Sequence, residues 1–291
     1  MRSSERPPPG SGTARLAVAA LALSPVLGAA YVDAAIARRR LASAGAAHRA
    51  LVRLQLGGML QGRTVEARAI GRGTANAVIA VRLVGDGPPI ELAVKQALPL
   101  GTVMAWGARH FGANYVYSTA SRSDRVAREA AALRYLADRG VAVPRCLAAD
   151  PARGLIATEW VDGVHAATAL RTAGASDRAR ELGGLLRRIH ELGVTLGDGH
   201  PGNMLVARAT GRLVVFDLEF AECTGSTPAR RGFDLAYAAA LLPDSALRDA
   251  MIAAYGPRTR DEHDAFGVAE RHLGRFGPLI ERERARWAAP R

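Results

Sequence analysis

The sequence contains almost no lysine. Its 291 residues include 39 lysine and arginine side chains, and Lys95 is the only lysine among them. Arginine presents a broad planar fork, whereas lysine carries a compact charge on a thin stem. A tight phosphate site can require the compact group. The context of Lys95 therefore decides between a functional lysine and the chance survival of one.

Cysteine and aromatic residues are also scarce. Cys146 and Cys223 are the two cysteines, and they form neither a disulfide framework nor a metal-binding motif. We interpret them as ordinary thiols in a reducing compartment. Aromatic residues make up 5% of the chain and alanine is abundant, which favours helix-rich packing with small side chains. The net charge of +12 favours anionic partners such as nucleotides, nucleic acid, acidic lipids or phosphorylated sugars, although a general bias toward arginine produces the same charge.

The sequence lacks a long run of strongly apolar residues. Residues 16–32 carry no charge, and a transmembrane helix, a signal peptide and a helical extension are the competing interpretations. The run is Ala-rich, contains proline and glycine, and is shorter than the roughly 20 apolar residues that span a bilayer. We therefore predict a partly disordered, helical extension over 1–60. Arg38, Arg39 and Arg40 suit either contact with anionic headgroups or a solvated helix face.

From Val65 onward, short β-rich runs precede helical patterns. The β-rich part over 61–162 and the helix-rich part over 163–291 predict an α+β fold with two lobes, joined near Glu159–Gly163. The expected strands are Val65–Ile70, Val78–Val84, Ile90–Val94, Leu155–Glu159, Met204–Val206 and Leu213–Phe216, and the expected helices are Arg125–Arg139, Asp177–Leu192 and Phe233–Tyr255.

The context of Lys95 indicates a phosphate site. Gly71 and Gly73 lie between two expected strands, where backbone amides can approach phosphate oxygens. Lys95 directly follows the expected strand Ile90–Val94, and a hairpin of this length can bring it under the glycine loop. Glu129 falls on the apolar stripe of its expected helix, with Val126 and Leu133. A carboxylate in such a stripe requires a cation nearby, and Lys95 is the candidate. The alternative is that Glu129 lies at the edge of the stripe and reaches solvent.

A second cluster follows in the helix-rich part. Residues 197–206 read Gly-Asp-Gly-His-Pro-Gly-Asn-Met-Leu-Val, and residues 213–219 read Leu-Val-Val-Phe-Asp-Leu-Glu. As a hairpin, these segments place Asn203 and Asp217 at the same end of adjacent strands. Their amide and carboxylate oxygens are hard ligands that suit Mg²⁺. Asp198, in the loop entering that end, can accept the proton of an attacking hydroxyl group.

This order of residues resembles the protein-kinase-like superfamily from about Val65 to the C-terminus. The segment around Asp198 is similar to the catalytic loop of aminoglycoside kinases, choline kinases and bacterial lipopolysaccharide-core kinases. The resemblance implies ATP and Mg²⁺ as cofactors. It implies Lys95 as phosphate anchor, Glu129 as its partner, Asp198 as catalytic base, Asn203 and Asp217 as Mg²⁺ ligands with Glu219 as a further one, Gly71 and Gly73 as phosphate loop, and Glu159 to Val161 as adenine-binding hinge.

Three features depart from the family pattern. Ala75 and Asn76 occupy the stretch of the third loop glycine, and Leu196 stands where a His or Tyr usually supports the catalytic loop. The segment from Asp217 to Asp234 is short, and the chain has no Ala-Pro-Glu motif after it. A peptide-docking activation segment usually needs more chain.

Other residues invite functional interpretation. We expect His190 to be structural and His200 to give a supporting hydrogen bond. The Arg- and aromatic-rich stretch 106–117 fits either packing on the small lobe or binding of a glycolipid or nucleic acid.

The sequence therefore predicts transfer of the ATP γ-phosphate to a hydroxyl group of an anionic small molecule or glycolipid, as in lipopolysaccharide kinases. The alternatives are an atypical serine/threonine protein kinase and an ATP-binding pseudokinase scaffold. Because a secreted protein would meet no ATP, we expect the chain in the cytoplasm, associated with the inner face of the membrane.

Overall fold

The computed structural model describes residues 35–37, 39–70, 76–98, 121–274 and 277–288. The predictions for residues 16–32, for Gly71 and Gly73 and for the stretch 106–117 lie outside these ranges. Within them, no helix has both the length and the apolarity needed to cross a membrane.

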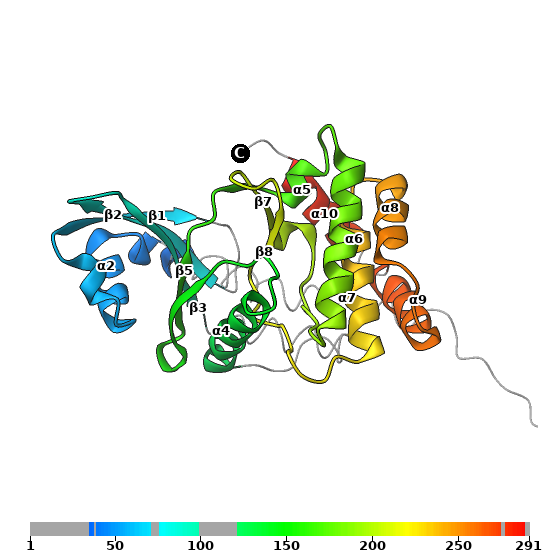
Figure 1. Cartoon of the computed structure of the whole chain (residues 1–291), viewed down its shortest axis with the longest axis horizontal. Helices are drawn as coiled ribbons and strands as arrows, with labels where there is room; N and C mark the ends of the chain where they lie inside the picture. The colour runs from blue at the N-terminus through cyan, green and yellow to red at the C-terminus, as the bar shows by residue number, and fades with distance from the viewer. Residues whose placement is uncertain (1–34, 38, 71–75, 99–120, 275–276, 289–291) are drawn as a thin grey trace, which may run out of the picture.

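The described chain forms a small β-rich lobe and a larger helical lobe, which confirms the predicted α+β fold (Figure 1). The small lobe contains a five-stranded sheet in the order β1-β2-β3-β5-β4, and the larger lobe contains a three-stranded sheet in the order β6-β7-β8. The small lobe consists of α2 Ala44–Arg53, β1 Arg63–Ile70, β2 Asn76–Gly85, β3 Ile90–Ala97, α4 Arg122–Ala137, β4 Cys146–Asp150 and β5 Leu155–Glu159. The larger lobe consists of β6 Gly163–His165, α5 Ala166–Ala169, α6 Ala175–Glu191, β7 Met204–Ala207, β8 Leu213–Val215, α7 Pro228–Ala240, α8 Ser245–Tyr255, α9 Arg260–Gly274 and α10 Gly277–Ala288.

The two faces of the small-lobe sheet have different roles. Alternate β2 residues, including Ile79 and Leu83, are buried in a core shared with Leu51 of α2. The helix therefore covers one face of the sheet. Because side chains alternate along a strand, Lys95 of β3 points to the other face, and its register partner on β2 is Val78. The sheet thus presents Lys95 to the site.

Helix α4 begins three residues before the predicted start. The Ser121 side chain accepts from the Asp124 backbone N–H at 3.1 Å, and Asp124 accepts the Ser121 backbone N–H at 3.0 Å. This reciprocal capping box fixes the start of the helix. Val126, Glu129 and Leu133 are all buried, as the helical period predicts.

The helical pattern predicted over Phe233–Tyr255 does not form one continuous helix. The chain forms α7 and α8 instead, because Pro243 interrupts the run and Asp244 caps the second helix through the Leu247 backbone N–H. The prediction also missed β4 and β6, each of which adds an edge strand to one of the two sheets.

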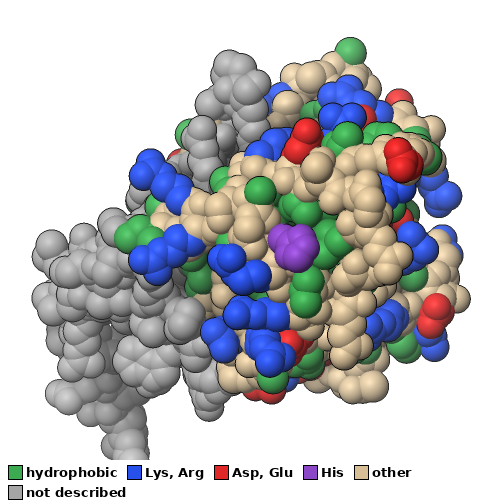
Figure 2. Space-filling view, turned by 90° about the vertical axis from the view of Figure 1, so that its left-hand side faces the viewer, with side chains coloured by type: hydrophobic (Ala, Val, Ile, Leu, Met, Phe, Trp, Pro, Cys, Tyr) green, Lys and Arg blue, Asp and Glu red, His purple; other side chains and the backbone are tan. Residues whose placement is uncertain are grey.

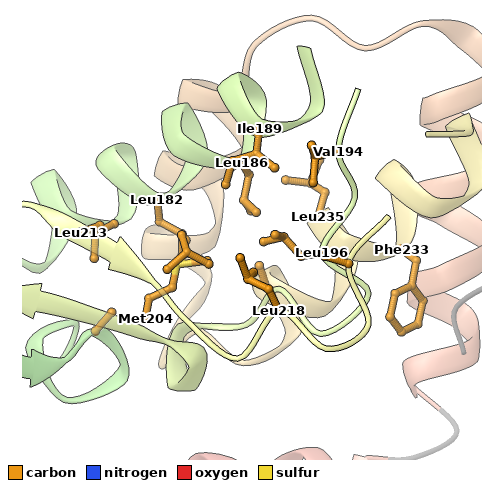
Figure 3. Close-up of a cluster of buried hydrophobic side chains, with 14 of the residues drawn as sticks. Leu182, Leu186, Ile189, Val194, Leu196, Met204, Leu213, Leu218, Phe233 and Leu235 are labelled. Carbon is orange, nitrogen blue, oxygen red and sulfur yellow. The ribbon is translucent and has the colours of Figure 1, made fainter. Parts of the chain in front are cut away.

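The core of the larger lobe lies directly behind residues 196–204, the segment that contains Asp198 and Asn203. Figure 3 shows Leu182, Leu186 and Ile189 of α6 pointing toward Leu196, Leu218 and Leu235. Helix α6 also approaches α8 so closely that a Cβ on Gly183 would lie 2.1 Å from the Met251 carbonyl oxygen. The loop that carries Asp198 is therefore supported by a packed layer of helices.

Candidate active site

Lys95 lies at the centre of a cluster of three carboxylates. Its Nζ is 2.8 Å from Glu129 Oε2 and 3.1 Å from Glu219 Oε2, and it donates a hydrogen bond to Asp217 Oδ1. The predicted ion pair between Lys95 and Glu129 is therefore present. The ammonium joins β3 and α4 of the small lobe to the segment that follows β8 of the larger lobe.

Burial and charge oppose each other in this cluster. Burial alone would lower the pKa of Lys95, but Asp217, Glu129 and Glu219 together hold that pKa well above its ordinary value. Burial raises the pKa of Glu129 to about 7, against the opposing effect of the Lys95 charge. The neighbouring carboxylates of Asp217 and Glu219 add to this rise in the pKa of Glu129.

Asp217 and Asn203 occupy the same end of the β7–β8 hairpin, as predicted. Met204 pairs with Val215, and the Phe216 backbone N–H donates to the Asn203 carbonyl oxygen at 3.0 Å. Asp217 has a φ of 61°, in the left-handed region that non-glycine residues rarely adopt. Such a backbone is found where the surrounding structure holds a functional side chain in place.

Asp198 is held by its neighbours in the catalytic segment. The Asn203 amide nitrogen donates to Asp198 Oδ2 and to the Asp198 carbonyl oxygen, both at 3.0 Å. His200 Nε2 lies 3.7 Å from Asp198 Oδ1, and His200 Nδ1 accepts the Gly202 backbone N–H at 3.0 Å. Burial raises the pKa of Asp198, whereas His200 opposes that rise. A carboxylate with a raised pKa is suited to accept a proton.

The loop before Asp198 is anchored from behind by Asp234 of α7. Its carboxylate accepts the backbone N–H groups of Leu196 at 2.6 Å and Gly197 at 2.8 Å. His190 lies 3.2 Å from the same carboxylate and 2.8 Å from the Tyr255 hydroxyl oxygen. His190 therefore has the structural position that the sequence predicts. The Leu196 side chain is apolar, but its backbone N–H makes a polar contact with Asp234 of α7.

The donor set at the hairpin end fits a magnesium ion. The side-chain amide nitrogen of Asn203 donates to Asp198. The amide oxygen of Asn203 therefore points away from Asp198. Asp217 follows the neighbouring strand at the same end of the hairpin, and its Oδ1 contacts Lys95. Ligand atoms of Glu129, Asp217 and Glu219 also lie within 4.8 Å of one another. Lys95 contacts all three carboxylates, and Glu219 also contacts Asn76 and Arg125, whereas Asp217 contacts Lys95 through Oδ1. Asn203 and the other carboxylate oxygen of Asp217 are therefore the donors that fit Mg²⁺.

Glu219 has partners that sequence reasoning missed. Asn76 Nδ2 donates to Glu219 Oε2 at 2.9 Å, and Arg125 Nη1 lies 3.2 Å from Glu219 Oε1. Both carboxylate oxygens of Glu219 therefore already contact donors. Glu219 is the residue predicted as a further Mg²⁺ ligand. A sequence signal for Arg125 existed, since it lies one helical turn before Glu129 on the same face of α4.

A cavity of about 390 Å³ lies beside the predicted hinge. Its lining includes Arg68, Ala80, Glu91 and Trp160, and the Arg68 guanidinium lies 5.4 Å from the Trp160 ring centroid. Ala80 and Glu91 point to the same face of the sheet as Lys95. Glu91 lies four residues before Lys95 on β3, and Ala80 lies two residues after Val78, the β2 partner of Lys95. The cavity therefore lies on the face of the sheet that carries Lys95.

The hinge residues have partly used their backbone donors. The Glu159 backbone N–H donates to the Arg145 carbonyl oxygen at 2.9 Å, and the Trp160 N–H to the Glu91 carbonyl oxygen at 3.3 Å. The Glu159 carboxylate faces the Arg145 backbone N–H. Binding of a base would therefore rely on the Glu159 carbonyl or on the backbone of Val161.

A sequence model described as the phosphotransferase enzyme family matches residues 66–197. The match includes Lys95 and Glu129 and ends one residue before Asp198. A curated protein, the KEOPS complex subunit Bud32 of Pyrococcus abyssi, is 30% identical over 117 residues, which cover 39% of this chain and 52% of that protein. The chain thus spans about half the length of this relative.

Two solved structures show similarity to the chain. The Rio2 kinase of Chaetomium thermophilum, in its ADP/Mg²⁺-phosphoaspartate complex, is 13% identical with a TM-score of 0.49, covering 83% of this chain and 77% of that chain. Spectinomycin phosphotransferase APH(9)-Ia, in complex with ADP and spectinomycin, is 12% identical with a TM-score of 0.48, covering 78% of this chain and 85% of that chain.

Proposed function

We propose that the chain is a kinase-like phosphotransferase and that it transfers the γ-phosphate of ATP to a hydroxyl group of an anionic small molecule or glycolipid. The observation that carries this proposal is the Lys95–Glu129 ion pair placed against Asp217, with Asp198 held by Asn203 beside it. These are the charges that phosphate transfer requires: a cation for the phosphates, oxygen ligands for a metal and a proton acceptor.

Each residue has a defined task in this reaction. Lys95 binds a nucleotide phosphate, while Asn203 and Asp217 would hold Mg²⁺, which neutralises phosphate charge when bound. The acceptor hydroxyl oxygen forms a bond to the γ-phosphorus as the bond from that phosphorus to the β,γ-bridging oxygen breaks. Asp198 accepts the proton of the hydroxyl group, which its raised pKa favours.

The segment after Asp217 supports a small acceptor. Residues 218–227 connect Asp217 to α7, and Glu222 is fixed within them. Thr195 and Glu222 exchange backbone hydrogen bonds at 3.0 and 2.8 Å, and the Glu222 carboxylate lies 2.6 Å from Arg230 Nη1. A short segment held at its middle offers little chain on which to dock a peptide.

The charge of the small lobe supports an anionic acceptor at a membrane surface. Residues 34–65 contain no acidic residue, and Arg39, Arg40, Arg49 and Arg53 are exposed. Figure 2 shows basic side chains spread over the face at the left of Figure 1, where acidic side chains are fewer. We propose that this face lies against anionic lipid on the cytoplasmic side of a membrane.

A second candidate function is phosphorylation of protein serine or threonine. The observation that favours it is the similarity to Bud32, a KEOPS complex subunit, in the segment that aligns with it. The short segment after Asp217 offers little surface for binding an extended peptide. A protein substrate would therefore have to present its serine or threonine without a long docked segment.

The experiment that separates these acceptors uses γ-labelled ATP, Mg²⁺ and a fractionated lysate. We expect label in the lipid or sugar fraction with the wild-type protein. Label confined to the protein fraction would support the second candidate and contradict the first. An Arg49→Gln, Arg53→Gln variant serves as the test of the basic face: it should keep labelling of soluble sugars and lose binding to vesicles of anionic lipid.

A further inference from the structure

We propose that Arg125 is a positioning residue of this site: it holds Glu219 so that Lys95 can leave that carboxylate and bind a nucleotide phosphate. The inference rests on the proposed function and deepens it. In this role Arg125 acts through Glu219, which its guanidinium contacts.

Arg125 is a wholly buried cation. Its side chain has no exposed surface, Nη2 donates to the Leu98 carbonyl oxygen at 2.6 Å, and Nη1 lies 3.2 Å from Glu219 Oε1. A buried guanidinium is costly unless it is paired, and removal of one partner leaves the other charge uncompensated. Arg125 and Glu219 therefore depend on each other inside the protein.

The other oxygen of Glu219 is shared. Oε2 accepts from Asn76 Nδ2 at 2.9 Å and lies 3.1 Å from Lys95 Nζ. Glu219 of the larger lobe thus contacts the first residue of β2, the middle of β3 and the first turns of α4. The contacts with Asn76 and Arg125 would hold Glu219 in place even if Lys95 moved away.

The donors of Lys95 explain why this matters. A lysine ammonium has three N–H donors, and Glu129, Asp217 and Glu219 surround Lys95 in the structure. To bind a phosphate, Lys95 must release one carboxylate. Glu219 is the carboxylate that Arg125 and Asn76 continue to hold. Without Arg125, release of Lys95 would leave Glu219 with a neutral amide as its only donor among these residues.

The charges of the cluster lead to the same result. Lys95 and Arg125 together carry two positive charges against the three carboxylates. Among the described residues of the cluster, loss of Arg125 would leave one cation, Lys95, and its attraction to three carboxylates would oppose its move to a phosphate. We therefore expect loss of Arg125 to weaken nucleotide binding more than it slows the chemical step.

The test uses Arg125→Gln, Glu219→Gln and the double variant, with Arg134→Gln as control. Arg134 lies exposed on the same helix. Binding of adenylyl imidodiphosphate with Mg²⁺ is measured by calorimetry, and the KM for ATP and kcat are measured separately. We expect Arg125→Gln to raise Kd and KM about tenfold, with a smaller change in kcat. Arg134→Gln should bind like the wild type.

The double variant distinguishes positioning from simple packing. If Arg125 acts through Glu219, removal of the Glu219 charge should restore Kd to within about threefold of the wild type. A Kd in the double variant as high as in Arg125→Gln would overturn the inference. So would an Arg125→Gln protein with a lowered melting temperature and an unchanged Kd. If Arg125→Gln does not fold, Arg125→Lys, which lacks the planar fork, takes its place in the same comparison.

Failure of the proposed function gives a different result. If the wild-type protein itself does not bind the nucleotide with Mg²⁺, the proposed function fails. If the wild type binds and the Arg125 variants bind equally well, only the positioning role fails.

Discussion

Asp234 Oδ2 accepts the backbone N–H of Leu196 at 2.6 Å, so helix α7 holds the loop before Asp198 through its main chain. This contact explains how the site tolerates Leu196 where a polar side chain is usual in the resembling kinases. The leucine side chain packs into the core, and the polar support comes from Asp234 (Figure 3). The hydrogen bond from the loop backbone to Asp234 therefore requires no polar side chain at position 196.

Asp234→Asn should therefore impair both stability and catalysis. The amide group replaces a carboxylate that accepts from Leu196, Gly197 and His190, and its NH₂ cannot accept. We expect a loss of about 3 kcal/mol in the free energy of unfolding and a lower kcat with little change in the KM for ATP. Urea unfolding and steady-state kinetics provide the measurements. An unchanged kcat in a destabilised protein would show that the contact serves the fold alone.

Two neighbouring glycines of α6 allow a matched test of helix packing. A Cβ on Gly183 would lie 2.1 Å from the Met251 carbonyl oxygen, whereas a Cβ on Gly184 would meet nothing within 4 Å. Gly183→Ala should separate α6 from α8 and destabilise the protein by 2 kcal/mol or more, on the order of an overpacked core. Gly184→Ala should stabilise it by about 0.5–1 kcal/mol through helix propensity. Thermal unfolding of both variants tests the pair, and equal melting temperatures would contradict the close approach.

The Glu129 carboxyl group predicts a specific pH dependence of stability. Burial raises its pKa from 4.5 to about 7 in the folded protein, so the folded state binds more protons than the unfolded state between these values. Its contribution to the free energy of unfolding is therefore fully present below 4.5 and declines as the pH rises through about 7. The total decline is at most about 3 kcal/mol. Glu129→Gln should remove this part of the slope, which melting temperatures between pH 4 and 8 would reveal; an unchanged slope would place the effect on another group.

The pKa of Asp198 predicts the acid limb of the pH–rate profile. Burial raises that pKa above the ordinary value of 3.8, and protonated Asp198 cannot accept the hydroxyl proton. Activity should therefore fall on acidification at a higher pH than an exposed aspartate would give. His200 opposes the rise, so His200→Gln should move the limb to still higher pH. Profiles of kcat/KM for the two proteins measure this shift, and a limb that stays in place would contradict a role for His200.

Sequence reasoning located the residues that share a local pattern. The period of α4 predicted the burial of Glu129, and the hairpin predicted that Asn203 and Asp217 lie at one end. It missed Arg125, because an arginine in a helix is usually solvated, although its spacing from Glu129 places both on one face. The contacts of Glu219 with Asn76 and Arg125 join segments far apart in the chain, which no local pattern encodes.

The central claim is that this site transfers phosphate with Asp198 as the base. Asp198→Asn keeps the size of the side chain and removes the proton acceptor. The decisive measurement is release of γ-phosphate label from ATP to the acceptor fraction by the wild type and by this variant, with nucleotide binding measured in parallel. We predict equal binding and a loss of transfer of at least about a hundredfold in the variant, in the range of general-base catalysis. Equal binding with no transfer by either protein, across lipid, sugar and protein fractions, would contradict the claim and indicate a nucleotide-binding scaffold.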